Sequence, residues 1–134
     1  MASNSEKMME DLFCRMNKEF VLKDLGEIRH FLGIEVEKDD HGCYMIKQER
    51  YIEEIVEKAG LKDAKISKYP LDPGYDKVID KEMLKDNTEY QKLIGMLLYL
   101  STNTRPDISA SVSILSQKIK GPSRNDLNEI KRVI

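Results

Sequence analysis

The sequence has few of the residues that build a zinc site, a disulfide framework or a membrane span. Its only cysteines, Cys14 and Cys43, each stand without a second cysteine nearby. Zinc sites and disulfide scaffolds need cysteines in close pairs or in larger numbers, so neither is indicated. No apolar run approaches the roughly 20 residues of a transmembrane helix, and the polar start does not resemble a secretory signal. We therefore expect an intracellular protein without a membrane partner.

Charge of neither sign dominates the sequence. The 22 Lys and Arg residues nearly cancel the 24 Asp and Glu residues, which leaves a formal net charge of −2. Because nucleic-acid binding depends largely on neutralising phosphates, this balance gives no global attraction to RNA or DNA. Any such contact would have to come from a local basic patch. The length of 134 residues suits one small domain, or a piece of a larger one.

The first part of the sequence predicts a helix followed by a β-hairpin. Apolar residues recur at helical spacing over residues 5–20, with Asn4 or Ser5 as the N-cap. Residues 28–37 and 43–47 are rich in strand-forming residues and flank a turn that contains glycine. We expect one continuous strand on each side of that turn.

The remainder is expected to be helical apart from one long connection. A second helix at about 49–59 should end at Gly60. Proline, glycine and scattered charge make residues 61–87 a connection, with an extended piece at 69–71. Three more helices are indicated by pairs spaced as capping boxes. These pairs are Thr88 with Gln91, Thr104 with Asp107, and Ser123 with Asp126. The predicted fold class is α+β.

Apolar residues predict how two of these helices pack. The first of the last three is apolar on all sides, so we expect burial nearly all round. Gly95 lies in its middle, where glycine costs roughly 1 kcal/mol relative to alanine, and this predicts close packing against another backbone. The next helix should bury one stripe, made of Ile108, Val112, Leu115 and Ile119.

Six short motifs occur in an order that resembles copia-type retrotransposon reverse transcriptases. They are Phe-Val-Leu-Lys-Asp-Leu-Gly at 20–26, His-Phe-Leu-Gly-Ile-Glu at 30–35, Gln48 with Tyr51, Tyr-Gln-Lys-Leu-Ile-Gly at 90–95 with Leu-Tyr-Leu at 98–100, Thr-Arg-Pro-Asp-Ile at 104–108, and Lys-Arg-Val at 131–133. Each motif is weak alone, but six in the family's order and approximate spacing are specific. The resemblance covers nearly the whole chain from about Leu12.

The resemblance implies a partial polymerase palm at 1–48, made of the helix and hairpin, and a helical thumb-like region at 49–134. A strand resembling the primer grip, which holds the end of the growing strand, would contain Phe31, Leu32, Gly33 and Ile34. The implied function is RNA-directed DNA polymerisation within a Pol polyprotein. The implied partner of the intact enzyme is an RNA–DNA primer-template, and this chain is expected to contact the remainder of the polymerase or a self-association partner.

The resemblance also implies Mg²⁺ for the intact polymerase, whose catalytic aspartates hold two divalent ions. Those aspartates would precede the matched motifs, so we expect neither catalysis nor a bound metal or cofactor from this chain alone. Asp39 and Asp40 are interpreted as a solvated turn, and ligands as close in sequence as His41 and Cys43 seldom converge on a metal with them. Lys23 matches a position near the departing pyrophosphate in related polymerases, or is a solvated loop charge.

Basic residues in three parts of the sequence are candidates for contacting phosphates without reading sequence. They are Lys62, Lys65 and Lys68; Lys118 and Lys120; and Arg124, Lys131 and Arg132. The alternative is that they are ordinary solvated charges. Arg105 would lie in the first turn of a helix, against the macrodipole, and therefore should reach a carboxylate or a phosphate. An ion pair with Asp107 or with the long connection is favoured.

Two other functions stay open at this point. A palm hairpin without its neighbouring strands would expose an edge and an apolar face, as suits a domesticated, non-catalytic scaffold or interaction module. A standalone nucleic-acid-binding module would instead show affinity that falls steeply with salt.

Overall fold

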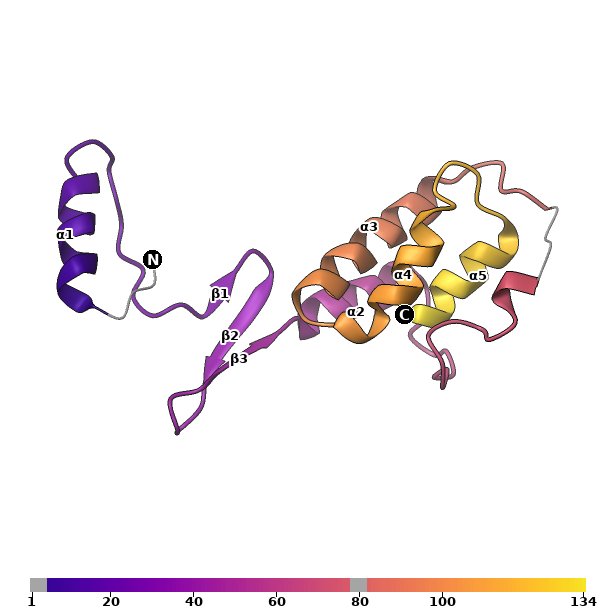
Figure 1. The fold of residues 1–134 in the computed structure, drawn as a ribbon, viewed down its shortest axis with the longest axis horizontal. Helices are drawn as coiled ribbons and strands as arrows, with labels where there is room; N and C mark the ends of the chain where they lie inside the picture. Colours follow the sequence, from indigo (N-terminus) through magenta and orange to yellow (C-terminus); the bar gives the residue numbers. More distant parts are fainter. Residues whose placement is uncertain (1–4, 78–81) are drawn as a thin grey trace.

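The computed structural model describes residues 5–77 and 82–134. In chain order the elements are α1 (Glu6–Met16), β1 (His30–Phe31), β2 (Ile34–Lys38), β3 (Tyr44–Lys47), α2 (Glu49–Lys58), the 3₁₀ turn η1 (Tyr75–Lys77), α3 (Thr88–Asn103), the 3₁₀ turn η2 (Pro106–Ile108), α4 (Ser109–Ser116) and α5 (Arg124–Val133). In Figure 1, α1 lies at one end, the sheet in the middle and α2–α5 together at the other end. The mixture of helices with a small antiparallel sheet confirms the α+β class.

The helix α1 forms where the periodicity predicts it but ends at Met16, four residues early. Asn17 follows as the C-cap residue, and its side-chain oxygen accepts a hydrogen bond from the backbone N–H of Leu22 at 3.2 Å. Asparagine often makes such local bonds at the end of a helix instead of continuing it. Ser5 occupies the N-cap position, and Asn4, the alternative cap, lies outside the described residues.

The expected first strand at 28–37 is in fact two strands, so that prediction was wrong. Leu32 and Gly33 have φ values of 50° and 78° and form the turn between β1 and β2. Two successive positive φ angles are typical of the two-residue hairpin turns that match strand twist. Glycine adopts such an angle at no steric cost, which is why the chain reverses here.

The second turn, between β2 and β3, has the predicted form. One carboxylate oxygen of Asp39 accepts hydrogen bonds from the backbone N–H groups of His41 and Cys43, at 2.9 and 2.7 Å. Gly42 completes the turn with a φ of 83°. The residues of this turn are exposed, so the interpretation of Asp39 and Asp40 as a solvated turn is confirmed.

The hydrophobic core lies entirely within the second part of the chain. Its most deeply buried side chains are Ile55, Tyr90, Ile94, Leu97, Val112, Leu115 and Ile130. Between residues 5 and 47, all of which are described, no residue is buried. Packing therefore begins at Gln48, the N-cap residue of α2, and the sheet and α1 contribute nothing to the core. No helix within the described ranges is long and apolar enough to cross a membrane.

The helix α2 stops where the sequence predicts. Gly60 has a φ of 68° and donates its N–H to the Glu57 carbonyl at 3.0 Å, while Leu61 donates to the Val56 carbonyl at 2.9 Å. These two bonds are those of the Schellman motif. The capping box at Ser123 is likewise confirmed, with reciprocal bonds to Asp126.

The other two predicted capping boxes were wrong. Asn87, not Thr88, is the N-cap residue of α3, and the Thr88 hydroxyl donates instead to Asp86 at 2.6 Å. Thr104 ends α3 instead of starting the next helix, since the proline two residues later cannot continue it. Its hydroxyl donates to the Gln48 side chain at 2.7 Å, which joins two of the family-like motifs.

Burial of α3 and α4 is less complete than expected. Leu98 and Gly95 of α3 are exposed, and a Cβ built on Gly95 would meet no atom within 4 Å, so the predicted close packing is absent. Ile108, Val112 and Leu115 form the predicted buried stripe, but Ile119 follows α4 in an exposed turn.

The connection before α3 is held against α5. The Tyr75 side chain is buried, and its hydroxyl donates to the Asp126 carboxylate at 2.6 Å. Met83 pairs with Ser123 in an isolated bridge. Residues 69–71 form bends and not the extended piece that was predicted, and residues 78–81 of the connection lie outside the described residues.

Candidate nucleic-acid interface

A cleft of about 680 Å³ lies among the helices of the second part of the chain. The end of α2 and residues 61–70 form part of its lining, and η2 and the end of α5 form the rest. Six basic residues and one acid line it: Lys62, Lys65, Lys68, Arg105, Lys131, Arg132 and Asp107. Most of the other lining residues are apolar: Val56, Leu61, Ala64, Ile66, Pro70, Ile108, Val133 and Ile134. The fold thus concentrates positive charge that the net charge of −2 conceals.

The structure brings together five of the eight basic residues that the sequence suggested, and adds Arg105 to them. The other three, Lys118, Lys120 and Arg124, lie between the end of α4 and the start of α5 and do not line the cleft. Arg124 is close to Glu82, with Nε 4.0 Å from the carboxylate.

The cleft cations differ in how strongly carboxylates already hold them. Lys62 pairs with Glu57 at 3.4 Å and Lys131 with Glu89 at 3.1 Å, and all four side chains keep substantial exposure. Exposed pairs of this kind contribute only about 0–1 kcal/mol, so a phosphate can compete for these two lysines. No ion pair involves Lys65 or Lys68 within the described ranges.

Arg105 makes the ion pair that its position predicts. Its Nε and Nη2 donate to the two carboxylate oxygens of Asp107 at 2.9 and 2.8 Å, in the two-pronged geometry that suits arginine. The hydrogen bond from Arg105 holds the pKa of Asp107 below its usual range, and the same bond raises the pKa of Arg105. The expectation of a structural ion pair is confirmed.

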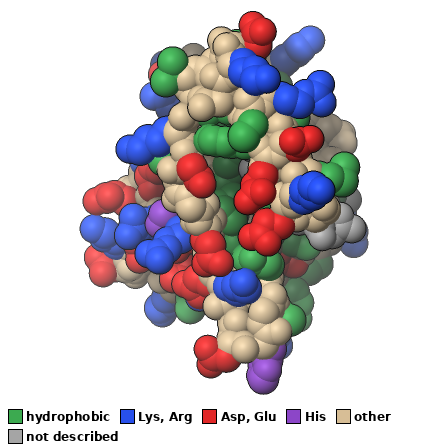
Figure 2. All heavy atoms as spheres, turned by 90° about the vertical axis from the view of Figure 1, so that its left-hand side faces the viewer, with side chains coloured by type: hydrophobic (Ala, Val, Ile, Leu, Met, Phe, Trp, Pro, Cys, Tyr) green, Lys and Arg blue, Asp and Glu red, His purple; other side chains and the backbone are tan. Residues whose placement is uncertain are grey.

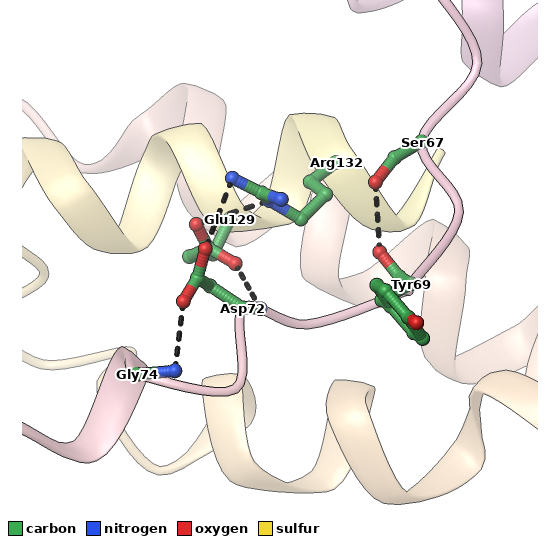
Figure 3. Close-up of polar contacts among 6 residues, drawn as sticks. All are labelled: Ser67, Tyr69, Asp72, Gly74, Glu129 and Arg132. Carbon is green, nitrogen blue, oxygen red and sulfur yellow. Dashed lines mark hydrogen bonds and ion pairs between the residues drawn. The ribbon is translucent and has the colours of Figure 1, made fainter.

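Arg132 is held more firmly than the lysines (Figure 3). Its Nε lies 3.2 Å from Oε1 of Glu129, which is buried, and its Nη2 lies 3.5 Å from Oδ2 of Asp72. Oε2 of Glu129 also accepts the backbone N–H of Asp72 at 2.9 Å. Glu129 therefore joins α5 to the segment that carries the opposite wall of the cleft.

That segment, residues 67–75, is here called the strap. Within it the Ser67 hydroxyl donates to the Tyr69 carbonyl at 2.9 Å, and the Asp72 carboxylate accepts the N–H of Gly74 at 2.7 Å (Figure 3). Sequence reasoning missed Tyr69, Asp72 and Glu129. Tyr69 follows Lys65 and Lys68 closely enough that an alternation of basic and aromatic residues was visible, whereas nothing in the sequence linked Asp72 to Glu129.

The residues matched to the primer grip lie elsewhere. Phe31, Leu32 and Gly33 are exposed at the β1–β2 turn and Ile34 is half-buried, and none of them lines the cleft. The hydroxyl of Tyr99 on α3 donates to the Leu32 carbonyl and ties this turn to the helices. Lys23 is exposed in the loop after α1. Its suggested role stays a prediction.

The described ranges contain no group of three or more His, Cys, Asp or Glu side chains that could hold a metal ion. The residues present therefore do not fit the pair of divalent ions that the resemblance implies for an intact polymerase.

Comparison with known proteins gives the family. The family model described as reverse transcriptase (RNA-dependent DNA polymerase) matches residues 1–73, more than half of the sequence. The chain belongs to this reverse transcriptase family. The reverse transcriptase resemblance that the motifs suggested is thereby confirmed, and transposon Pol polyproteins among the relatives support its retrotransposon part.

Relatives of the chain include an uncharacterized mitochondrial protein of Arabidopsis thaliana, 31% identical over the whole chain and 55% of its own length. A putative transposon Ty5-1 protein of Saccharomyces cerevisiae is 29% identical over 99% of the chain and 44% of its own length. The retrovirus-related Pol polyprotein from transposon RE1 of Arabidopsis thaliana is 32% identical over 98% of the chain but only 9% of the polyprotein. The chain thus spans about half of the first two relatives. No solved structure matches it.

Proposed function

We propose that this chain supplies the primer-grip and thumb side of a retrotransposon reverse transcriptase and contacts the phosphates of an RNA–DNA primer-template through the basic cleft. The main support is that residues of two motifs of the family resemblance, at 104–108 and 131–133, both line this cleft although they lie on different elements. Both contribute basic side chains there, beside the lysines of residues 62–68.

In this proposal the palm-like part is residues 1–48 and the thumb-like part is residues 49–134. The β1–β2 turn would contact the primer end, and its tie to Tyr99 would keep the turn in register with the helices. Polymerisation would require Mg²⁺ and aspartates supplied by the remainder of the polymerase, so the chain alone should not incorporate nucleotides. An intracellular location goes with this function.

The test is binding of a labelled RNA–DNA primer-template by the full chain at two salt concentrations. Replacing Lys65 and Lys68 by alanine should weaken binding and reduce the slope of log K against log salt by about 2, since each phosphate contact contributes about 1 to that slope. The matched control replaces Lys118 and Lys120, which carry the same charge outside the cleft, and should leave the slope closer to that of the unaltered chain. Equal effects of the two double variants would contradict a role for the cleft.

A non-catalytic interaction module is a second candidate, favoured by the exposure of the first part of the chain. Large hydrophobic side chains are open there, among them Met8, Phe20, Val21, Leu25 and Leu32. Figure 2 shows hydrophobic side chains at the surface of this end, with acidic side chains around them. Sedimentation over a rising concentration series separates the candidates, because a strictly monomeric chain would count against self-association through this surface.

A further inference from the structure

We infer that the basic cleft binds a single-stranded stretch of nucleic acid and that Tyr69 is the platform on which a base stacks. This inference rests on the proposed function, because it specifies which form of nucleic acid enters the same cleft. It concerns a residue that none of the family-like motifs contains.

The size of the cleft favours a single strand. Its volume of about 680 Å³ falls in the range of roughly 300–1,000 Å³ typical of pockets that enclose small organic molecules. A nucleotide or two fits such a space, whereas a double helix could touch only its rim. The apolar lining supplied by Val56, Leu61 and Ile108 suits bases and sugars between the charged residues.

Tyr69 does not line the cleft itself but adjoins it, where a base that extends out of the cleft can stack. It stands between Lys68 and Pro70, which both line the cleft, and the Lys68 ammonium lies 5.9 Å from the centre of its ring. The side chain is 53% exposed, so a ring face remains accessible. The Ser67 hydroxyl fixes the Tyr69 carbonyl, and the Glu129 contacts hold the strap on α5 (Figure 3).

The lysines beside Tyr69 supply the positive charge that a single-strand site also needs. Proteins that bind single strands combine a positive groove for the backbone with aromatic rings for the bases. Lys65 and Lys68, the two cleft lysines without an ion pair in the described ranges, are the ones nearest to Tyr69 in sequence. A phosphate can therefore bind beside the ring without first displacing a carboxylate.

The experiment measures fluorescence anisotropy of a labelled 12-nucleotide single strand, and of a blunt duplex of the same sequence, with the full chain at low salt. The single strand should bind more tightly. Tyr69→Leu should weaken its binding about 5- to 150-fold, which is the 1–3 kcal/mol of one stacked base, with an unchanged salt slope because no charge is lost. Tyr69→Trp should restore binding.

Tyr44→Leu is the matched control, because Tyr44 is 60% exposed on β3, outside the β1–β2 turn, and also has a lysine over its ring, Lys38 at 5.4 Å. It should bind as the unaltered chain does. A duplex that binds as well as the single strand, or a Tyr69→Leu variant within twofold of the unaltered chain, would overturn this inference. The proposed function would survive that result if the Lys65 and Lys68 variants still weakened binding, and absence of binding to any nucleic acid at low salt would overturn both.

Discussion

Glu129→Gln tests whether one buried carboxylate holds the strap in place. Glutamine retains an oxygen for the Asp72 N–H, but it turns an NH₂ group toward Nε of Arg132, which now forms an ion pair with Glu129 at 3.2 Å. A hydrogen bond to a charged group is worth about 1.5–3 kcal/mol and a neutral one about 0.5–1.5 kcal/mol. Solvent reaches the Arg132 side chain and screens part of the difference, so we expect a loss of about 1–2 kcal/mol.

The assay for Glu129→Gln is urea unfolding, with the m-value required to stay constant so that the shift in midpoint reports stability. Glu53→Gln is the matched control, since Glu53 is exposed on α2 and should change stability by no more than about 0.5 kcal/mol. The strap should also open more often, so the variant should bind the single strand less tightly. If Glu129→Gln were as neutral as the control, the reasoning about the strap would be refuted.

Three further predictions concern stability and use the same unfolding assay. Gly95→Ala should stabilise the chain by about 0.5–1 kcal/mol, because the site is inside α3 and the added Cβ meets no atom within 4 Å. Gly60→Ala should cost about 1–2 kcal/mol, since its φ of 68° is unfavourable for alanine, and a neutral result would contradict the Schellman assignment. Burial raises the pKa of Tyr90, whose hydroxyl donates to the Leu115 carbonyl at 2.7 Å. The stabilisation by the protonated phenol is complete below the unfolded pKa of about 10. Above that pH it is lost at up to about 1.4 kcal/mol per pH unit. Tyr90→Phe should therefore remove the part of the alkaline loss of stability that this phenol causes.

Some features that depend on residues close together in the chain were predicted correctly. The stop of α2 at Gly60 and the box at Ser123 both follow from backbone geometry within one turn of helix, so single residues were enough to predict them. The turn at 32–33 was missed because an apolar run favours a continuous strand, and a single glycine inside such a run marks a bulge as often as a turn. The box expected at Thr88 failed because Asp86 is an even closer partner for its hydroxyl.

The cleft could be predicted only in part. Its basic residues were recognisable as separate groups, but their convergence depends on how residues 61–70 fold back onto α5. The contact that fixes this arrangement joins Asp72 to Glu129, and neither residue stands out by charge or spacing. A buried carboxylate that accepts a distant backbone N–H leaves no periodic trace in a sequence, which is why the site's geometry required the structure.

The two proposed nucleic-acid contacts, the basic cleft and the β1–β2 turn, lie on parts of the chain that differ in stability. The cleft is built from the segment that contains the whole buried core of the described chain, so its shape is supported by apolar packing. The β1–β2 turn is joined to that segment by the Tyr99 bond to Leu32 and by an ion pair at 3.4 Å between the exposed Arg50 and the half-buried Glu35. Such a pair contributes about 0–1 kcal/mol, too little to fix an uncovered hairpin. Binding by the isolated chain therefore reports on the cleft, whereas a primer-grip role for the turn needs a partner that covers the apolar face of the sheet.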